Sequence, residues 1–197
     1  MIFMKRVGVF GGSFDPVHKE HVNMLVAAMN AFSIDEFIVM PTFISPHKIG
    51  AKLCSAADRM EMAKIAFRNI RRVTVSDYEI KKEGISYTYS TLEHIKKELG
   101  DVELYFLVGT DMLTDFPTWR FPERILSVAK IIVTQRKGED LAFALSLFYD
   151  RFSARPLVSP YVGDRASSTK IRARLILGLE CDEYLDEGVL SYIEKNS

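Results

Sequence analysis

Three runs of almost uninterrupted apolar residues constrain the fold of this 197-residue chain more than any other feature. They are residues 37–40 (FIVM), 104–108 (LYFLV) and 130–134 (KIIVT). Strands have this composition when helices cover both faces of a parallel sheet, because neither face meets water. Helical patterns separate the runs, and alternating strands and helices are typical of an α/β domain. The sequence therefore predicts a doubly wound parallel sheet with helices on both faces.

The alternation continues along the chain and predicts one Rossmann-like domain over residues 1–197, with a C-terminal helical part at about 165–197. The predicted strands are 6–10, 36–40, 73–76, 103–108, 130–134 and 156–158. The predicted helices are 18–32, 56–67, 90–99, 140–152, 169–177 and 188–195. Ser90 and Glu93 fit a capping box, and the charged residues of 77–83 are expected in a solvated loop. Ligands of such sheets bind at the carboxyl ends of the strands.

The charge balance, the length of the apolar runs and the cysteine pattern indicate which partners and which compartment to expect. Lys and Arg together number 26, as do Asp and Glu, so the basic excess of a nucleic-acid-binding surface is missing. No apolar run approaches the ~20 residues of a membrane span. Cys54 and Cys181 form no CxxC pair, which suits a reducing compartment. We expect a cytoplasmic protein that acts on small molecules, without nucleic-acid or membrane partners; a homodimer is left open.

Residues 11–21 (GGSFDPVHKEH) place two glycines and two histidines directly after the first predicted strand. Glycine lets a backbone approach a ligand closely. His18 and His21 are three residues apart, so they share a helical face in a first turn whose free N–H groups attract anions. The stretch is neither GxGxxG nor a P-loop. The predicted role of the histidines is therefore to bind phosphate; two surface histidines behind a simple turn are the alternative.

Two further stretches carry groups that suit phosphate. Residues 167–172 (SSTKIR) open a predicted helix, where Ser168 and Thr169 add hydroxyl donors and Arg172 adds a forked positive charge. Residues 45–48 (SPHK) follow the second predicted strand and offer Lys48 as a phosphate contact. An ordinary serine-capped helix with exposed basic residues is the alternative for the first stretch.

Together these stretches resemble the nucleotidylyltransferase superfamily, whose motifs are GGxFDPxHxGH and ISSTxIR. Five separated motifs, in family order from about residue 7 to residue 193, are similar to those of bacterial nicotinate-nucleotide adenylyltransferases. The chain departs from the family motifs at three positions: Glu20 replaces glycine, Ser45 replaces proline and Ala166 replaces isoleucine. The resemblance implies adenylyl transfer from ATP to nicotinate mononucleotide, which yields deamido-NAD and pyrophosphate in NAD biosynthesis.

The resemblance implies a direct in-line attack of the mononucleotide phosphate on the α-phosphorus of ATP. The attacking phosphate is already ionised near pH 7, so alignment and charge stabilisation would carry catalysis without a general base. Mg²⁺ would bridge the phosphates with few protein ligands. The expected catalytic residues are His18, His21, Lys48 and Arg172. The expected ATP-binding residues are Gly11, Gly12, Ser13, Phe14, Gly109, Asp111, Ser168 and Thr169.

The family motifs SYTxxTL and PxW, matched at residues 86–92 and 117–119, imply the place of the nicotinate mononucleotide. A helix start at Thr88 and Tyr89 would offer N–H groups to the nicotinate carboxylate. Trp119, the single tryptophan, would stack on the pyridinium ring. The adjacent Arg120 is a candidate for the mononucleotide phosphate.

Two other functions stay open at this point. A pantetheine-phosphate adenylyltransferase shares the histidine and SSTxIR motifs, but it is typically shorter and lacks the SYTYSTL and PTW pair. A nucleotide-binding sensor that has lost turnover is the second alternative. The features that keep it open are the departures from the family motifs at Glu20, Ser45 and Ala166. At Glu20, a carboxylate beside a triphosphate would be repulsive unless it points away.

Overall fold

A computed structural model describes residues 4–51, 53–164 and 166–196 of the chain. Its centre is a six-stranded sheet in which every neighbouring pair is parallel, in the order β3-β2-β1-β4-β5-β6. The strands are β1 (Lys5–Gly12), β2 (Glu36–Pro41), β3 (Val73–Val75), β4 (Val102–Gly109), β5 (Ala129–Arg136) and β6 (Leu157–Gly163). The predicted doubly wound Rossmann-like sheet is confirmed.

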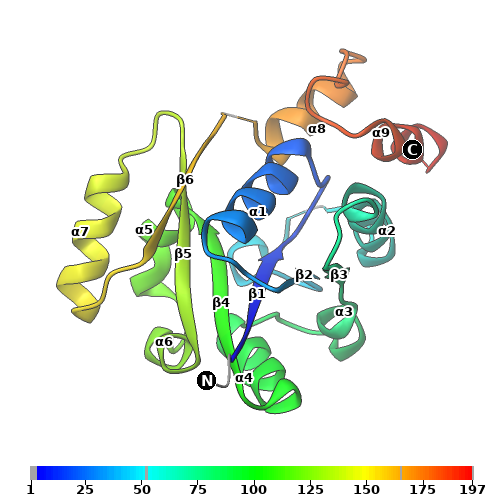
Figure 1. The fold of residues 1–197 in the computed structure, drawn as a ribbon. Helices are drawn as coiled ribbons and strands as arrows, with labels where there is room; N and C mark the ends of the chain where they lie inside the picture. The colour runs from blue at the N-terminus through cyan, green and yellow to red at the C-terminus, as the bar shows by residue number, and fades with distance from the viewer. Residues whose placement is uncertain (1–3, 52, 165, 197) are drawn as a thin grey trace.

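Helices cover both faces of this sheet (Figure 1). They are α1 (Lys19–Ala31), α2 (Ala56–Phe67), α3 (Tyr78–Lys82), α4 (Thr88–Leu99), α5 (Thr110–Asp115), α6 (Pro122–Val128), α7 (Leu141–Phe152), α8 (Ser168–Ile176) and α9 (Glu187–Asn196). Short 3-10 helices occupy Pro46–Lys48 and Phe116–Thr118. Within the described residues, no helix combines the length and the apolar composition that crossing a membrane requires.

The central strand β4 shows how the two faces form two cores. Its side chains alternate between them, because successive residues of a strand point to opposite faces. Tyr105 and Leu107 join the core of α1, whereas Phe106 and Val108 join the core of α4 and α7. Because both faces are covered, β4 is buried along most of its length, which explains its continuous apolar run.

The strand order reverses beside β1, and this reversal positions the functional site. From β1 the chain continues through α1 to β2 on one side, while β4 pairs with β1 on the other side. Connections that leave β1 and β4 toward opposite sides open a crevice at their carboxyl ends. The glycine turn after β1 and the α5 start after β4 both border that crevice.

Two local predictions about α3 and α4 were wrong. Residues 77–83 are not a loop, because Tyr78–Lys82 form α3 and its Glu79 is buried. The capping box at Ser90 is absent, because α4 begins two residues earlier, at Thr88. The hydroxyl of Ser90 instead accepts a hydrogen bond from Lys82 Nζ at 2.7 Å, and Glu93 pairs with Arg124.

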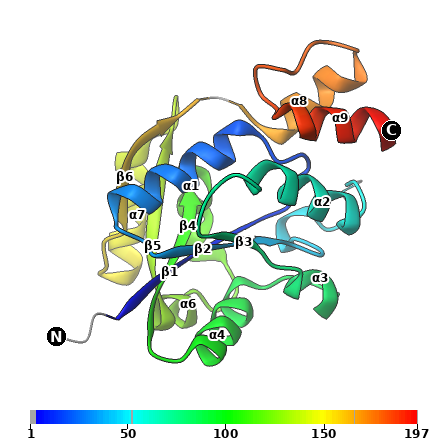
Figure 2. The ribbon, with the colours of Figure 1, turned by 45° about the vertical axis from the view of Figure 1, so that its right-hand side comes forward.

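The helices α8 and α9 lie side by side beyond β6 (Figures 1 and 2). Strand β6 runs to Gly163, so residues 167–172 do follow a strand, contrary to the expectation of only a short strand at 156–158. Ile171 and Val189 are buried in the same core as α1. Tyr192 of α9 donates a hydrogen bond to Asp58 of α2 at 2.9 Å. The C-terminal helices therefore share a core with the sheet.

Candidate active site

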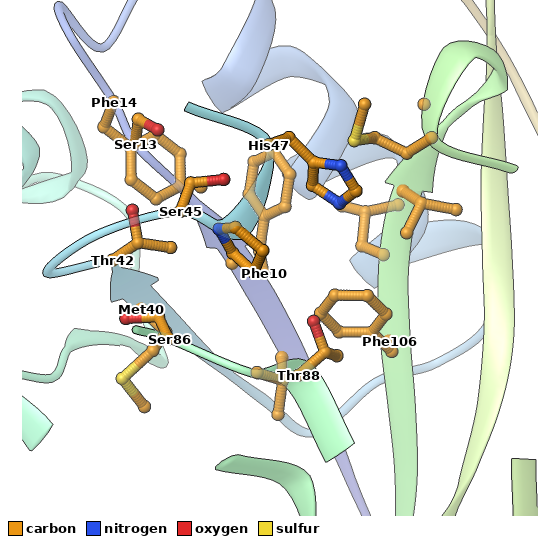
Figure 3. A pocket seen from close by; sticks show the side chains of 18 of the residues that line it. Phe10, Ser13, Phe14, Met40, Thr42, Ser45, His47, Ser86, Thr88 and Phe106 are labelled. Atoms are coloured by element: carbon orange, nitrogen blue, oxygen red, sulfur yellow. The ribbon is translucent and has the colours of Figure 1, made fainter. Parts of the chain in front are cut away.

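A cavity of about 680 Å³ opens at the carboxyl ends of the central strands, within the size range of small-molecule sites. Its walls come from the glycine turn after β1, the start of α1, the loop after β2, the start of α4, the end of β4 and the start of α8. Figure 3 shows Ser13, His47, Thr88 and Phe106, from four of these segments, around one space. Segments that are distant in sequence thus form one site.

His18 and His21 form a stacked pair at the start of α1. His18 is the N-cap residue, and the two ring centroids lie 3.7 Å apart. The backbone N–H of His18 donates to His21 Nδ1 at 3.1 Å. An Nδ1 that accepts carries no proton, so the neutral His21 ring holds its proton on Nε2. Both rings line the cavity, which leaves the Nε2–H of His21 available as a donor.

Burial keeps both histidines neutral near pH 7. It lowers the pKa of His18 to about 3, with a smaller contribution from the nearby positive charge of Arg136. Burial, followed by His18 and Arg136, also lowers the pKa of His21 well below its usual value of 6.5. A neutral imidazole still donates a hydrogen bond to a phosphate oxygen. The pair therefore offers directed donors, while the positive charge of the site comes from other residues.

The turn after β1 packs against the histidine pair. Gly11 and Gly12 pair with Met40 and Pro41 of β2, and all of residues 11–14 line the cavity. A Cβ atom at Gly12 would lie only 3.1 Å from the ring of Phe14, so this position leaves little room for a side chain. The Phe14 ring is buried and contacts His21 edge-on, with centroids 5.2 Å apart. Phe14 thus fixes the orientation of the catalytic candidate His21.

Lys48 brings a positive charge to the cavity from the loop after β2. It ends the short 3-10 helix Pro46–Lys48 and lines the cavity together with Ser45 and His47. Burial, and then the charge of Arg172, lowers the pKa of Lys48. Positive charges that lie this close together attract a polyanion such as a triphosphate.

The start of α8 closes the cavity, and the helix begins at Ser168, one residue before the predicted start at 169. Ser167 is the N-cap residue, and its hydroxyl accepts a hydrogen bond from Lys170 N. Ser168 instead donates to the carbonyl of Pro16 at 3.0 Å, while Ser168 and Thr169 both line the cavity. Arg172 does not line it: its guanidinium donates to the Asp15 carbonyl and lies 3.6 Å from the Asp15 carboxylate.

At the end of β4, the predicted ATP-binding residues Gly109 and Asp111 line the cavity together with Arg136, and their contact with ATP stays a prediction. Arg136 Nη1 lies 3.3 Å from Asp111 Oδ2. A Cβ at Gly109 would meet Asp111 Oδ1 at 2.6 Å, so only glycine leaves space for this carboxylate. The sequence prediction missed Arg136; its position at the carboxyl end of β5, after an apolar run, was the available signal.

The start of α4 forms the opposite part of the predicted site. Ser86 and Thr88 line the cavity, and so does Glu79 of α3, which has 6% of its surface exposed. Glu79 accepts a hydrogen bond from the Thr91 hydroxyl at 2.6 Å. Burial raises the pKa of Glu79 although the hydroxyls of Thr91 and Ser86 oppose this shift. Glu79 was also missed, because the four other charged residues of 77–83 indicated a solvated loop and not a buried position.

Trp119 and Arg120 reach the cavity, whereas the side chain of Tyr89 does not. Trp119 packs against Phe116 at 5.1 Å and lies 5.7 Å from the His47 ring. Tyr89 instead packs edge-on against Phe121. Any contact of Tyr89 with a ligand in this cavity would therefore come from its backbone.

Five buried polar atoms of cavity-lining residues have no hydrogen-bond partner among the described residues. They are His18 Nδ1, Thr42 Oγ1, Glu79 Oε2, Asp111 Oδ1 and Trp119 Nε1. Buried polar groups are nearly always paired in folded proteins, with protein, water or ligand. Their distribution around one cavity makes its walls suited to a polar ligand that extends along it.

Arg59 of α2 links two of the loops that border the cavity. Its side chain is buried, and Nη1 donates to the carbonyls of Ser13 at 2.8 Å and Thr42 at 2.7 Å. Nη2 donates to the carbonyl of Phe43 at 3.0 Å, and Nε donates to that of Cys54 at 3.2 Å. One guanidinium thus fixes the turn after β1 against the loop after β2. This role was not predictable from the residue pattern, because Arg59 lies in an ordinary predicted helix over 56–67.

Comparison with known proteins defines the class of this chain. A family model described as cytidylyltransferase-like matches residues 9–174. Two solved structures of the Plasmodium falciparum nicotinic acid mononucleotide adenylyltransferase, complexed with APC and with NaAD, share the fold, with TM-scores of 0.76 and 0.77. They are 22% and 23% identical and cover 98% of this chain and 96% of their own. The chain is thus a cytidylyltransferase-like α/β protein.

Curated relatives narrow the class to one family. A protein of Clostridium botulinum strain Eklund 17B, named "Probable nicotinate-nucleotide adenylyltransferase", is 37% identical over 197 residues, 98% of each chain. A Clostridium kluyveri protein of the same name is 35% identical over 198 residues, again 98% of each chain. The chain therefore belongs to the nicotinate-nucleotide adenylyltransferase family, and the resemblance seen in its sequence is confirmed.

Proposed function

We propose that this protein transfers the adenylyl group of ATP to nicotinate mononucleotide, yielding deamido-NAD and pyrophosphate for NAD biosynthesis. One observation carries this proposal: a single cavity is lined both by the histidine pair with Lys48 and by the α4 start with Trp119. A site for one nucleotide alone would not need the second set. Full-length relatives of the same family name support the same reaction.

The phosphates of ATP lie, in this proposal, over the glycine turn and the histidine pair. His21 Nε2–H donates to an oxygen of the reacting phosphate, and His18 assists beside it. Lys48, from the loop after β2, and Arg136, from the end of β5, supply positive charge. The backbone N–H groups of Ser168 and Thr169, with the Thr169 hydroxyl, add donors for the outer phosphates, while the Ser168 hydroxyl keeps its bond to the Pro16 carbonyl. These groups would stabilise the charge that shifts toward pyrophosphate in the transition state.

Arg172 acts indirectly in this scheme. Because it donates to the Asp15 carbonyl and faces the Asp15 carboxylate, it fixes the turn that carries the phosphate-binding backbone. Its expected direct contact with ATP stays a prediction for the liganded enzyme.

The mononucleotide binds beside the α4 start and Trp119. The N–H groups at Thr88 and Tyr89 face the nicotinate carboxylate, while the Trp119 ring stacks on the pyridinium. Arg120, whose guanidinium lies 4.7 Å from the Tyr87 ring centroid, is placed for the mononucleotide phosphate. This arrangement brings an ionised phosphate to the α-phosphorus, so the protein supplies alignment and no general base.

Mg²⁺ enters this proposal as part of the ATP complex. Among the described residues, no three His, Cys, Asp or Glu side chains converge on a point that could hold a metal ion. An ion held mainly by phosphate oxygens fits such a site, because Mg²⁺ keeps several waters and binds few carboxylates. When bound, it neutralises part of the triphosphate charge.

The test is pyrophosphate release from ATP and Mg²⁺ with nicotinate mononucleotide, nicotinamide mononucleotide or phosphopantetheine offered in parallel. A strong preference for the nicotinate substrate supports the function and the carboxylate assignment at Thr88. Turnover that favours the nicotinamide form contradicts that assignment but keeps the mechanism. ATP binding without release from any of the three contradicts the function and favours a sensor.

Two features beyond the reaction belong to the same proposal. We place the enzyme in the cytoplasm, where ATP is abundant and where the two free thiols, Cys54 and Cys181, persist. The homodimer left open by the sequence stays a prediction, which analytical ultracentrifugation of the purified chain would test.

A further inference from the structure

Glu20 occupies the position where the family motif has glycine, between Lys19 and His21 in the first turn of α1. Its carboxylate does not line the cavity. It accepts hydrogen bonds from the backbone N–H of Asp164 at 2.8 Å and from the Tyr161 hydroxyl at 3.0 Å. Glu20 therefore binds the end of β6 instead of facing the cavity.

Gly163 leaves room for this contact. A Cβ atom at Gly163 would lie 3.0 Å from Glu20 Oε2, which is tighter than an ordinary contact. Gly163 also pairs in register with Arg136 of β5, and its carbonyl accepts from Lys137 N at 2.8 Å. The carboxylate of Glu20 thus reaches the backbone of β6 at the strand end beside Arg136, a cavity-lining residue.

The neighbouring Lys19 contacts the chain on the other side of α8. Its backbone N–H donates to the Tyr184 carbonyl at 2.8 Å, and its ammonium donates to the Asp182 carbonyl at 2.6 Å. The first turn of α1 therefore binds the chain before α8 through Glu20 and the chain after α8 through Lys19. His21, one residue further, faces the cavity.

We propose that Glu20 is a positioning residue for adenylyl transfer, which holds the end of β6 so that the start of α8 is fixed over the cavity. The inference rests on the proposed function, because the α8 start is there assigned to the phosphates of ATP. The donors that Glu20 controls are the N-terminal turn of α8, with Ser168 and Thr169. Loss of its carboxylate would leave this turn held by fewer contacts and would weaken ATP binding.

The experiment compares Glu20→Ala, Glu20→Gly and Glu20→Gln with the wild type in the pyrophosphate-release assay. We expect Glu20→Ala and Glu20→Gly to raise KM for ATP about tenfold, because they weaken the binding of ATP in the ground state and the transition state alike. KM for the mononucleotide should not change. Glutamine keeps an oxygen that accepts from Asp164 N, so it should restore a KM for ATP within about threefold of wild type. Glu187→Ala, an exposed first-turn glutamate of α9, is the matched control and should change neither constant.

Tyr161→Phe tests the same contact from β6 and keeps the inference open to refutation if the Glu20 variants fold poorly. It removes one hydroxyl and should raise KM for ATP by about two- to fivefold. Hydrogen exchange of the peptides that cover β6 and the α8 start should quicken in Glu20→Ala and in Tyr161→Phe. Exchange at α4 should stay the same.

The outcomes separate this inference from the proposed function. If wild type releases no pyrophosphate, the proposed function fails. If wild type turns over but Glu20→Ala keeps its KM for ATP and its protection at α8, the positioning role is wrong. A lower KM for ATP in Glu20→Ala would also overturn it, because that result means that the carboxylate repels the triphosphate.

Discussion

The two histidine rings of the cavity stack with their centroids 3.7 Å apart, and burial keeps both of them neutral near pH 7. Two adjacent imidazolium rings would repel each other, whereas two neutral rings can lie this close. At the scale of single residues, the site therefore separates its tasks. The histidines give directed hydrogen bonds, and Lys48 and Arg136 give charge.

The first prediction concerns His21 and its role at the reacting phosphate. His21→Ala should lower kcat by about 10²–10³, in line with the loss of one donor that stabilises a developing oxyanion. Steady-state pyrophosphate release measures the change. His94→Ala is the matched control, because His94 stacks on Tyr78 away from the active-site cavity. An effect below about threefold on kcat would remove His21 from the proposed mechanism.

The second prediction concerns pH and stability. A histidine whose pKa is lower in the folded state binds fewer protons than in the unfolded chain between pH 6.5 and the folded value. The free energy of unfolding should therefore fall as the pH drops below 6.5, by up to about 1.4 kcal/mol per unit for each histidine. For His18 this window extends down to a pKa of about 3.

Urea unfolding between pH 7.5 and 5.0 measures this dependence. His18→Asn should flatten the decline in the free energy of unfolding, because asparagine takes up no proton in either state. Proton NMR of the two rings gives an independent check: their C2–H signals should not titrate between pH 8 and 5 in the free protein. A titration with its midpoint near 6.5 would contradict the neutral pair.

Trp119 provides the third prediction. Trp119→Ala should raise KM for nicotinate mononucleotide about tenfold, since stacking on a cationic ring contributes on the order of 1–2 kcal/mol. KM for ATP should stay within twofold. Trp119→Phe keeps an aromatic face, so its KM for nicotinate mononucleotide should lie between those of the wild type and Trp119→Ala. If the alanine variant loses ATP affinity instead, the ring contacts the other substrate.

At the scale of secondary-structure elements, the strands were predictable and their cross-connections were not. The apolar runs that gave β2, β4 and β5 reflect burial on both faces, a property that each strand carries in its own composition. Arg59 differs, because its four carbonyl partners come from three separate segments and only the folded chain brings them together. The histidines of the first turn of α1 lie between these cases. Their phosphate-binding role was predictable from neighbouring residues, whereas the stacking of their rings was seen only in the folded structure.

The fourth prediction tests the link that Arg59 makes between these elements. Arg59→Lys keeps the charge but cannot reach the carbonyls of Ser13, Thr42 and Phe43 together. Unpaired buried carbonyls should lower the free energy of unfolding by about 2–4 kcal/mol. A displaced turn should lower kcat/KM about 10- to 100-fold. Arg71→Lys, on an exposed arginine, is the control and should change neither quantity.

At the scale of the whole molecule, the two cores meet across one sheet. The core of α1 contains Ile171 and Val189 from the C-terminal helices, whereas Trp119 packs against the core of α4 and α7. Strand β4 contributes side chains to both, so disruption of either core removes support from the same strand. The prediction of one domain over residues 1–197 therefore implies cooperative unfolding, which is measurable.

Val189→Ala supplies the last prediction. Val189 is fully buried in the core of α1, and its truncation should lower the free energy of unfolding by about 1–3 kcal/mol. Trp119 reports on the opposite core through its fluorescence, and far-UV circular dichroism reports on all helices. In a single cooperative unit both signals should shift to the same lower urea midpoint. If the fluorescence midpoint stays at the wild-type value while the dichroism midpoint falls, the C-terminal helices unfold on their own and the one-domain prediction is wrong.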